Sequence, residues 1–402
     1  MNMYSTQNAK VERVIDVVSK RFSTYGYTRI KTAAFEKYDL YSTVTSSVNR
    51  KEMVKVIDTT GDVLVLRPDV TIPITQELSH VCNHLTSEYR FYYIQEVFRQ
   101  SFEKSEKTER TQAGIEYFCE SSPEADAETI ALAIQMMKDL NFKEMKIEIG
   151  HTAFFNEIVN GLHLQEEQLE RLKTLVVSKN IGELNLFIQQ LLIDPKRKLA
   201  IEQLPFLYGK PEEVLERAKE IVPLPNVIKT VCYIEEIYRI LKLYGLDEYV
   251  VIDFGLMNHM DYYSGVLFQG YVERLGKPVL MGGRYDELGK KFEAELPAIG
   301  FACEIESLVK ALQNSAVDNA NQIDLKIIYE ESELGSAIQL AAKLRALDLR
   351  VVIASKTKES MNSIDERCII RMYEQEHIVE FQGNEQPFTS IEQLDWLGGN
   401  DK

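Results

Sequence analysis

Two segments rich in aromatic and β-branched residues, 91–98 and 115–119, flank one polar stretch at 100–111. Such residues favour β-strands, and the polar stretch can return the chain, so the pattern predicts two strands of one antiparallel sheet. Two shorter runs, 54–58 and 63–66, flank a turn-forming TTGD sequence and predict a hairpin. The expected fold therefore centres on antiparallel β-structure.

Helices are expected on both sides of these strands. Apolar residues recur at three- and four-residue steps between Val11 and Phe22, and the pattern returns in later segments. We expect a turn at Gly282-Gly283, because a glycine pair after a strand is typical of a turn. Further helices are expected at 71–84, 125–140 and 304–312, and further strands at 27–32, 144–150, 249–254, 265–271 and 278–281.

The chain is expected to contain two domains. The first covers 1–312 and includes a helical insertion at about 165–246, which is rich in Leu, Glu, Lys and Ile and punctuated by prolines. A small, polar linker follows at 313–322. A compact α/β unit at 323–402 should hold a helix and several strands. We expect that helix at 334–347 and the strands near 325–329, 349–354, 368–372 and 378–381.

Charge and cysteine content argue against several classes of function. The chain of 402 residues has 62 acidic and 46 basic residues and a formal net charge of −16, which disfavours binding of nucleic acid. Its five cysteines form no CxxC pair, and no segment has the pattern of a secretion signal or a membrane span. We therefore expect a soluble protein of the reducing cytoplasm.

Neither a metal nor a cofactor is expected. The closely spaced histidines His80 and His84 lack the intervening glutamate of a zinc-protease helix, and no third ligand is evident. The glycine pair at 282–283 lacks the spacing of a phosphate-binding loop, and no nucleophile motif occurs.

Polar residues at the edges of the predicted strands could line a small-molecule pocket. Each alone is an ordinary surface or structural residue. Together their carboxylates, amide and tyrosine hydroxyls could bind a zwitterionic amino acid, with acidic groups for its ammonium and for a ring N–H. These residues are Arg67 and Asp69 in LRPDVT, Arg99 after FYYIQEVF, Gln112 and Glu116 in TQAGIE, and Asp261, Tyr262 and Tyr263 in DYY.

The order of LRPDVT, YIQEVFRQ, TQAGIE, MDYYSGVLF, GGRYDEL and PAIGFACEIESL resembles the catalytic domain of class II aminoacyl-tRNA synthetases of the histidyl type. The resemblance covers about residues 4–312. It implies an α+β fold with an antiparallel sheet flanked by helices, a helical insertion between the second and third class motifs, and a dimer formed through the first motif.

The same resemblance implies roles for individual residues. Asp69, Thr71 and Gln112 would face the α-ammonium of histidine, while Glu116 and Tyr263 would face its imidazole, with Tyr262 beside them. Arg99 matches the motif-two arginine that contacts ATP phosphate in synthetases.

This sequence lacks two positively charged residues that the synthetases need for adenylate formation. Asn258 stands where the family has the arginine of LVRGLDYY, and Ser307 replaces the terminal arginine of the third motif. Because preorganised cations stabilise the transferring phosphate, their loss should remove synthetase turnover. We therefore expect no enzymatic activity and assign no catalytic residue, and Arg99 becomes a vestigial phosphate ligand.

A preserved histidine pocket beside a lost ATP clamp resembles the synthetase-like regulatory subunits of ATP phosphoribosyltransferase, the first enzyme of histidine biosynthesis. That resemblance implies a catalytically silent subunit that joins a short catalytic chain in a hetero-octamer. It would be required for the activity of that chain and would confer feedback inhibition by L-histidine. The C-terminal unit is similar to a shortened anticodon-binding domain.

Two alternatives stay open at this point. The chain could be a divergent histidyl-tRNA synthetase or a histidine-activating ligase that tolerates Asn258 and Ser307. It could instead be a binding module that senses histidine for another partner.

Overall fold

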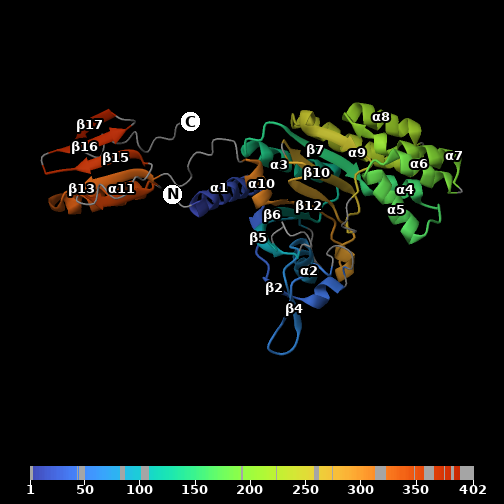
Figure 1. Ribbon diagram of the computed structural model, residues 1–402, viewed down its shortest axis with the longest axis horizontal. Coiled ribbons are helices and arrows are strands. Elements are labelled where there is room, and N and C mark those ends of the chain that lie inside the picture. Colours follow the sequence, from blue (N-terminus) through green and yellow to red (C-terminus); the bar gives the residue numbers. More distant parts are fainter. Residues whose placement is uncertain are drawn as a thin grey trace. The chain divides into compact units, whose positions relative to one another are not determined.

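The computed structural model divides into two compact units, Val11–Ser315 and the pair of segments Met1–Lys10 and Ala316–Lys402 (Figure 1). The linker expected at 313–322 lies outside the described residues. Those residues are 3–42, 44, 50–81, 87–100, 108–191, 193–222, 224–257, 262–273, 275–312, 323–347, 349–356, 366–374, 376–381 and 384–389.

A nine-stranded sheet in the order β1-β5-β6-β12-β11-β10-β7-β9-β8 forms the centre of the larger unit. Its strand pairs are antiparallel except β1–β5 and β7–β9, which are parallel. The α+β class predicted from the sequence, with a largely antiparallel sheet, is confirmed. The strands are β1 (Thr28–Arg29), β5 (Tyr89–Phe98), β6 (Glu109–Phe118), β7 (Met145–His151), β8 (Tyr208–Gly209), β9 (Val250–Asp253), β10 (Val266–Val272), β11 (Leu280–Arg284) and β12 (Ala298–Glu304).

Helices pack on this sheet and bury the main core. Helix α3 (Pro123–Asp139) contacts β10, β12 and α9 (Pro225–Leu243), as Figure 1 shows. It begins at Pro123 because Ser122 caps it, accepting a hydrogen bond from Ala125 N at 3.3 Å. Alternate residues of β7, such as Ile147 and Ile149, are fully buried in this core. Val14, Val18 and Phe22 of α1 (Met3–Thr24) belong to this core, and α10 (Ile305–Ala311) contacts β6 and β12.

Short helices occupy most of the segment between β7 and β9. Prolines stand in the first turn of α7, α8 and α9, where a missing backbone N–H costs no hydrogen bond. None of the helices in the described ranges is long and apolar enough to cross a membrane. The elements before α9 are α4 (Thr152–Val159), α5 (Glu166–Val177), α6 (Ile181–Gln189), α7 (Pro195–Gln203), η3 (Leu204–Phe206), β8 and α8 (Pro211–Ile221), and η4 (Asp247–Tyr249) follows α9.

A three-stranded sheet in the order β2-β4-β3 precedes helix α2 (Thr71–Val81) in the larger unit. The hairpin predicted from the TTGD turn is confirmed, because β3 and β4 pair antiparallel on either side of it. The elements are β2 (Phe35–Lys37), η1 (Tyr38–Ser42), β3 (Lys55–Ile57) and β4 (Val63–Leu66), and η5 (Gly289–Phe292) contacts α2.

The smaller unit contains a five-stranded sheet in the order β14-β13-β15-β16-β17. Leu340 and Leu344 of α11 (Leu334–Arg345) share a buried cluster with Ile327 and Ile370 of the sheet. The sequence analysis did not predict β17. The strands are β13 (Ile323–Tyr329), β14 (Val351–Ser355), β15 (Glu366–Met372), β16 (His377–Phe381) and β17 (Asn384–Phe388), and η6 (Glu331–Glu333) precedes α11.

The prediction of a turn at Gly282-Gly283 is wrong. Both glycines lie inside β11, where they pair with Phe301 and Gly300 of β12. The sequence analysis also missed β12 itself, and it placed the start of β6 too late, since that strand begins at Glu109. The glycine pair marks a close approach of neighbouring side chains to the strand rather than a reversal of the chain.

Candidate functional site

One cavity of about 250 Å³ opens over β6, β11 and β12, and the six residues expected to bind an amino acid all line it. Asp69 precedes α2 and Thr71 begins it, Gln112 and Glu116 lie on β6, and Tyr262 and Tyr263 precede β10. Because side chains alternate along a strand, Gln112 and Glu116 project from the same face of the sheet. The cavity therefore joins segments that are far apart in the sequence.

Glycines make room for the side chains of the cavity. Gly300 lies opposite Glu116 on one side and opposite Gly283 on the other. A Cβ on Gly300 would overlap the carboxylate of Glu116, and a Cβ on Gly283 would lie 2.8 Å from Cδ1 of Tyr263. The glycine pair that the sequence analysis interpreted as a turn thus accommodates the ring of Tyr263.

Glu116 is a buried acid, only 3% exposed, with hydrogen bonds to both of its oxygens. Thr71 Oγ1 donates to Oε1 at 2.5 Å, and the hydroxyl of Tyr285 donates to Oε2. Burial raises the pKa of Glu116 to about 8, although the two hydrogen bonds act in the opposite direction. A ligand N–H or a cation beside this carboxylate would stabilise its charged form.

Asp69, Arg99 and Gln112 form a second polar group in the same cavity. Asp69 Oδ1 accepts a hydrogen bond from Ile72 N at 2.9 Å at the start of α2. Its other oxygen, Oδ2, lies 3.8 Å from Nη2 of Arg99. Burial raises the pKa of Asp69, and the charge of Arg99 opposes that shift. Gln112 Oε1 is buried without a hydrogen-bond partner.

Tyrosine rings form much of the cavity wall. The ring of Tyr262 lies with its centroid 4.7 Å from that of Tyr263 and 5.7 Å from that of Tyr285. Burial raises the pKa of Tyr285 well above its usual value, so its hydroxyl stays protonated and donates to Glu116. The sequence analysis missed Tyr285 as a site residue. Its signal was its position directly after the glycine pair and Arg284, at the end of β11, a strand that the sequence analysis ended too early.

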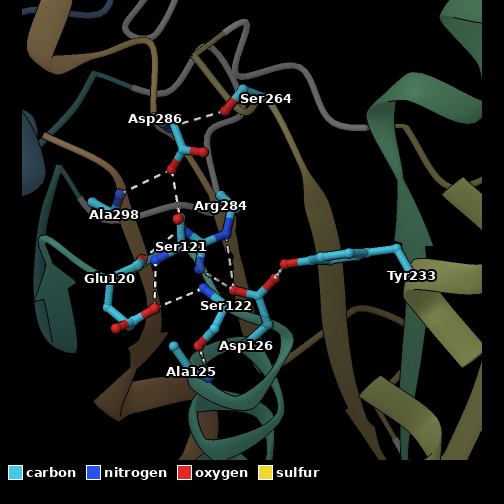
Figure 2. Close-up of polar contacts among 10 residues, drawn as sticks. All are labelled: Glu120, Ser121, Ser122, Ala125, Asp126, Tyr233, Ser264, Arg284, Asp286 and Ala298. Atoms are coloured by element: carbon cyan, nitrogen blue, oxygen red, sulfur yellow. Dashed lines mark hydrogen bonds and ion pairs between the residues drawn. The ribbon is translucent and has the colours of Figure 1, made fainter. Parts of the chain in front are cut away.

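A buried ion pair next to Tyr285 connects this wall to two helices (Figure 2). The side chains of Arg284 and Asp126 are 5% and 0% exposed, and Arg284 Nε donates to Asp126 Oδ1 at 2.9 Å. Tyr233 of α9 donates its hydroxyl to Asp126 Oδ2 at 2.7 Å. Arg284 therefore ties β11 to α3 and, through Asp126, to α9.

Asp286 extends this network to the loop that carries the tyrosine pair (Figure 2). Its Oδ1 accepts from Arg284 Nη1 and from Ala298 N, both at 3.0 Å. Its backbone N–H donates to Ser264 Oγ at 2.9 Å, directly after Tyr263. The positions of the tyrosine rings thus depend on a polar network outside the cavity.

Other residues singled out from the sequence lie elsewhere. Arg67 is buried and donates to the backbone carbonyls of Ala33 and Glu96, each at 2.7 Å, so it holds the backbone rather than lining the cavity. Ser307 lies on α10, where its hydroxyl donates to Glu304 Oε2 at 2.8 Å. The positions of Asn258, Asp261 and His84 fall outside the described residues.

The cavity has further lining residues that the sequence analysis did not select. Lys277 Nζ lies 3.9 Å from Glu304 Oε2, so these two charges form an ion pair at its edge. Among the described residues, no group of three or more His, Cys, Asp or Glu side chains could hold a metal ion. The additional lining residues include Tyr93, Lys277, Cys303 and Glu304.

Comparisons with known proteins place this architecture among the synthetases. The family model described as histidyl-tRNA synthetase matches residues 2–308. An ATP phosphoribosyltransferase regulatory subunit from Oceanobacillus iheyensis is 42% identical over 96% of this chain and 94% of its own length. One from Clostridium acetobutylicum is 31% identical over 84% of each chain.

Solved structures agree with this assignment. A crystal structure described as an ATP phosphoribosyltransferase regulatory subunit/histidyl-tRNA synthetase from Bacillus halodurans has a TM-score of 0.79 and 29% identity, covering 90% of this chain and 94% of that one. A histidyl-tRNA synthetase from Nostoc has a TM-score of 0.81 at 17% identity, covering 97% and 95% of the two chains, and shows the shared fold.

Proposed function

The chain belongs to the family of ATP phosphoribosyltransferase regulatory subunits, and from this premise we propose that L-histidine is its effector. Residues 2–308 of the chain also match the family model of histidyl-tRNA synthetase. We propose further that it joins a short catalytic subunit, that this subunit needs it for activity, and that histidine bound to it inhibits the complex. The reducing cytoplasm is the proposed location.

The buried carboxylate of Glu116 is the observation that supports histidine as the ligand. Its two oxygens already accept hydrogen bonds from Thr71 and Tyr285, and burial disfavours its charge. An imidazole N–H, or an imidazolium, would supply a further donor to that carboxylate. Asp69 and Gln112 supply oxygen atoms for an ammonium group in the same cavity of about 250 Å³.

Catalytic silence is part of the proposal, and Ser307 supports it. The hydroxyl at this position bonds Glu304, which also accepts a hydrogen bond from Arg110 Nη1 at 2.8 Å. Ser307 carries no charge, so it cannot replace an arginine that stabilises a transferring phosphate. Asn258 is likewise uncharged.

A self-dimer within the proposed hetero-octamer is supported by apolar side chains on the small β2-β4-β3 sheet. Phe35 of β2 is 54% exposed, and Ile57 of β3 is 72% exposed. Val63, which pairs with Ile57, is 44% exposed. Ile57 and Val63 are paired and so project from one face of the sheet, whereas Phe35 is paired with Leu66 and projects from the other face. The exposed apolar pair of Ile57 and Val63 is the proposed contact of the self-dimer.

Activity of the same organism's short catalytic chain, measured with and without this protein across a histidine titration, tests the proposal. We expect activity that depends on this protein and falls as histidine rises. No change on mixing would contradict the regulatory role. Histidine-dependent ATP–pyrophosphate exchange by this chain alone would show an active synthetase instead.

Measuring the binding of L-histidine directly tests whether the effector occupies this cavity. By calorimetry, we expect Glu116→Gln to bind L-histidine at least about tenfold more weakly, because hydrogen bonds to charged groups contribute about 1.5–3 kcal/mol. Lys146→Gln, which removes an exposed charge on β7, is the control and should leave the affinity unchanged. Equal affinity of wild-type protein and Glu116→Gln would place histidine outside this cavity.

A further inference from the structure

Helix α11 of the smaller unit has apolar residues on two of its faces. Leu340 and Leu344 lie on the face that packs on the five-stranded sheet, and both are buried. Leu334 and Ile338 lie on another face of the same helix and are 38% and 49% exposed. A helix that packs on one sheet needs only one apolar face. The fold of this unit therefore does not account for the second one.

The second apolar face continues along the helix. An α-helix turns about 100° per residue, so residues four apart lie close to one line along its surface. Leu334, Ile338 and Ala342 form such a line, and all three are exposed. Gly335 lies beside this line, and a Cβ there would meet nothing within 4 Å. Because Gly335 and Ala342 are small, a second helix could approach this face closely.

A charged residue lies at each end of the line. Arg345 follows Ile338 by seven residues, close to two helical turns, so it lies on the same side of α11. Its Nη2 donates to Val351 O at 2.8 Å, which holds the guanidinium in place without neutralising its charge. Glu331 lies in η6, which runs directly into α11. A 3₁₀-helix has three residues per turn, so Glu331 is in line with Leu334.

This line is complementary to a reversed copy of itself. A twofold axis at Ile338 would place Leu334 of one chain against Ala342 of the other, since each is four residues from the axis. The same axis would place Glu331 of each chain near Arg345 of the other, since each is seven residues from it. A parallel arrangement would instead bring like charges together, which is unfavourable.

We propose that this face of α11 binds α11 of a second copy of this chain, with the two helices antiparallel and Ile338 at the centre of the contact. The contact joins an apolar centre to an acid–base pair at each end. It goes beyond the proposed regulatory function, because neither the effector nor the catalytic subunit takes part in it.

The contact is too small to hold two chains together by itself. Helix α11 has 12 residues and is therefore about 18 Å long. Stable protein interfaces bury about 1,200–2,000 Å² in total, more than one pair of such helices supplies. Chains that are already joined in an assembly have a high effective concentration for each other, so a weak contact can form between them. The α11 contact would thus add to the self-dimer proposed for the β2-β4-β3 sheet.

Disulfide trapping in the full-length protein tests this contact. All variants carry Cys232→Ser, which removes an exposed native cysteine. Ile338→Cys should form a disulfide-linked dimer on mild oxidation, because residues at a twofold axis face each other. Ser336→Cys is the matched control, since it is exposed on the same helix but lies about 160° around it from Ile338. We expect the control to give at least about tenfold less linked dimer.

Two further variants test the register and the charges. Leu334→Cys and Ala342→Cys, co-expressed with different tags, should link to each other at least about threefold more than either links to itself. Glu331→Arg, added to Ile338→Cys, should lower the yield of linked dimer at least about threefold, because it replaces attraction to Arg345 by repulsion. Every substituted position on η6 and α11 is exposed, so the smaller unit should keep its fold.

Three results would count against the proposal. Equal yields of linked dimer from Ile338→Cys and Ser336→Cys would overturn it. Leu334→Cys that links to itself as strongly as to Ala342→Cys would rule out the antiparallel register. An unchanged yield in Glu331→Arg would show that the terminal charges do not meet across the contact.

Discussion

Glu116 is buried between Thr71 and Tyr285, so its carboxyl group is harder to ionise in the folded protein than in the unfolded chain. Its usual pKa of 4.5 rises to about 8 on folding. The folded state therefore holds more protons than the unfolded state between these values, and stability falls as the pH rises through that range. Bound ligand would offset this cost by supplying a donor to the carboxylate.

We expect the free energy of unfolding of the ligand-free protein to decrease between about pH 5 and pH 8, by up to about 1.4 kcal/mol per pH unit from this group. Glu116→Gln, which cannot ionise, should flatten this part of the profile. Urea denaturation at several pH values measures it. Parallel profiles for the wild-type protein and the variant would show that Glu116 ionises normally in the fold.

At the scale of secondary-structure elements, the positions of β11 and β12 depend on glycines, which have no side chain. A Cβ on Gly300 would overlap both the Glu116 carboxylate and the backbone oxygen of Ile115. A side chain at this position would have to displace the strand as well as the acid. Because residue 300 is a glycine, β12 can lie close to β6 even though β6 carries Glu116 at the paired position.

Gly300→Ala should lower the free energy of unfolding by about 1–3 kcal/mol, the usual range for overpacking, and should weaken histidine binding. Gly182→Ala on α6 is the matched control, because a Cβ there would meet nothing within 4 Å. That control should be neutral or slightly stabilising. Denaturant unfolding compares the two, and equal stability of the two variants would contradict the steric argument.

The ion pair between Arg284 and Asp126 joins three elements: β11, α3 and, through Tyr233, α9. Asp126→Ala would leave the guanidinium buried without its main partner, so we expect a loss of about 3–5 kcal/mol in the free energy of unfolding. Tyr233→Phe removes one hydrogen bond and should cost only about 1 kcal/mol. Thermal or urea unfolding measures both. Similar losses for the two variants would indicate that the ion pair contributes little.

At the scale of the whole molecule, the exposed apolar side chains of the β2-β4-β3 sheet are expected to mediate self-association. Ile57→Lys should shift the protein from dimer to monomer, because it places a charge in the proposed interface. Leu243→Lys, at a residue that is 76% exposed on α9, is the control. Sedimentation velocity distinguishes the two species. A dimer that persists in Ile57→Lys would place the interface elsewhere.

Much of the candidate site was predictable from the sequence because its chemistry depends on residue types within short motifs. LRPDVT, TQAGIE and DYY each carried their polar residues in recognisable contexts, and the structure brings Asp69, Thr71, Gln112, Glu116, Tyr262 and Tyr263 around one cavity. Tyr285 was missed because the glycine pair before it suggested a turn. Local sequence does not distinguish a glycine needed for backbone reversal from one needed for close packing.

The sequence alone determined the class of fold, the family, and the antiparallel pairing of β5 with β6 and of β3 with β4, because periodicity and motif order are properties of the chain. Only the tertiary structure decided how Arg67, Arg99 and Arg284 differ. Arg67 binds backbone carbonyls, Arg284 pairs with Asp126, and Arg99 Nη2 lines the cavity without a hydrogen-bond partner. The three side chains are chemically identical, so burial and the partners that distant segments supply determine their roles.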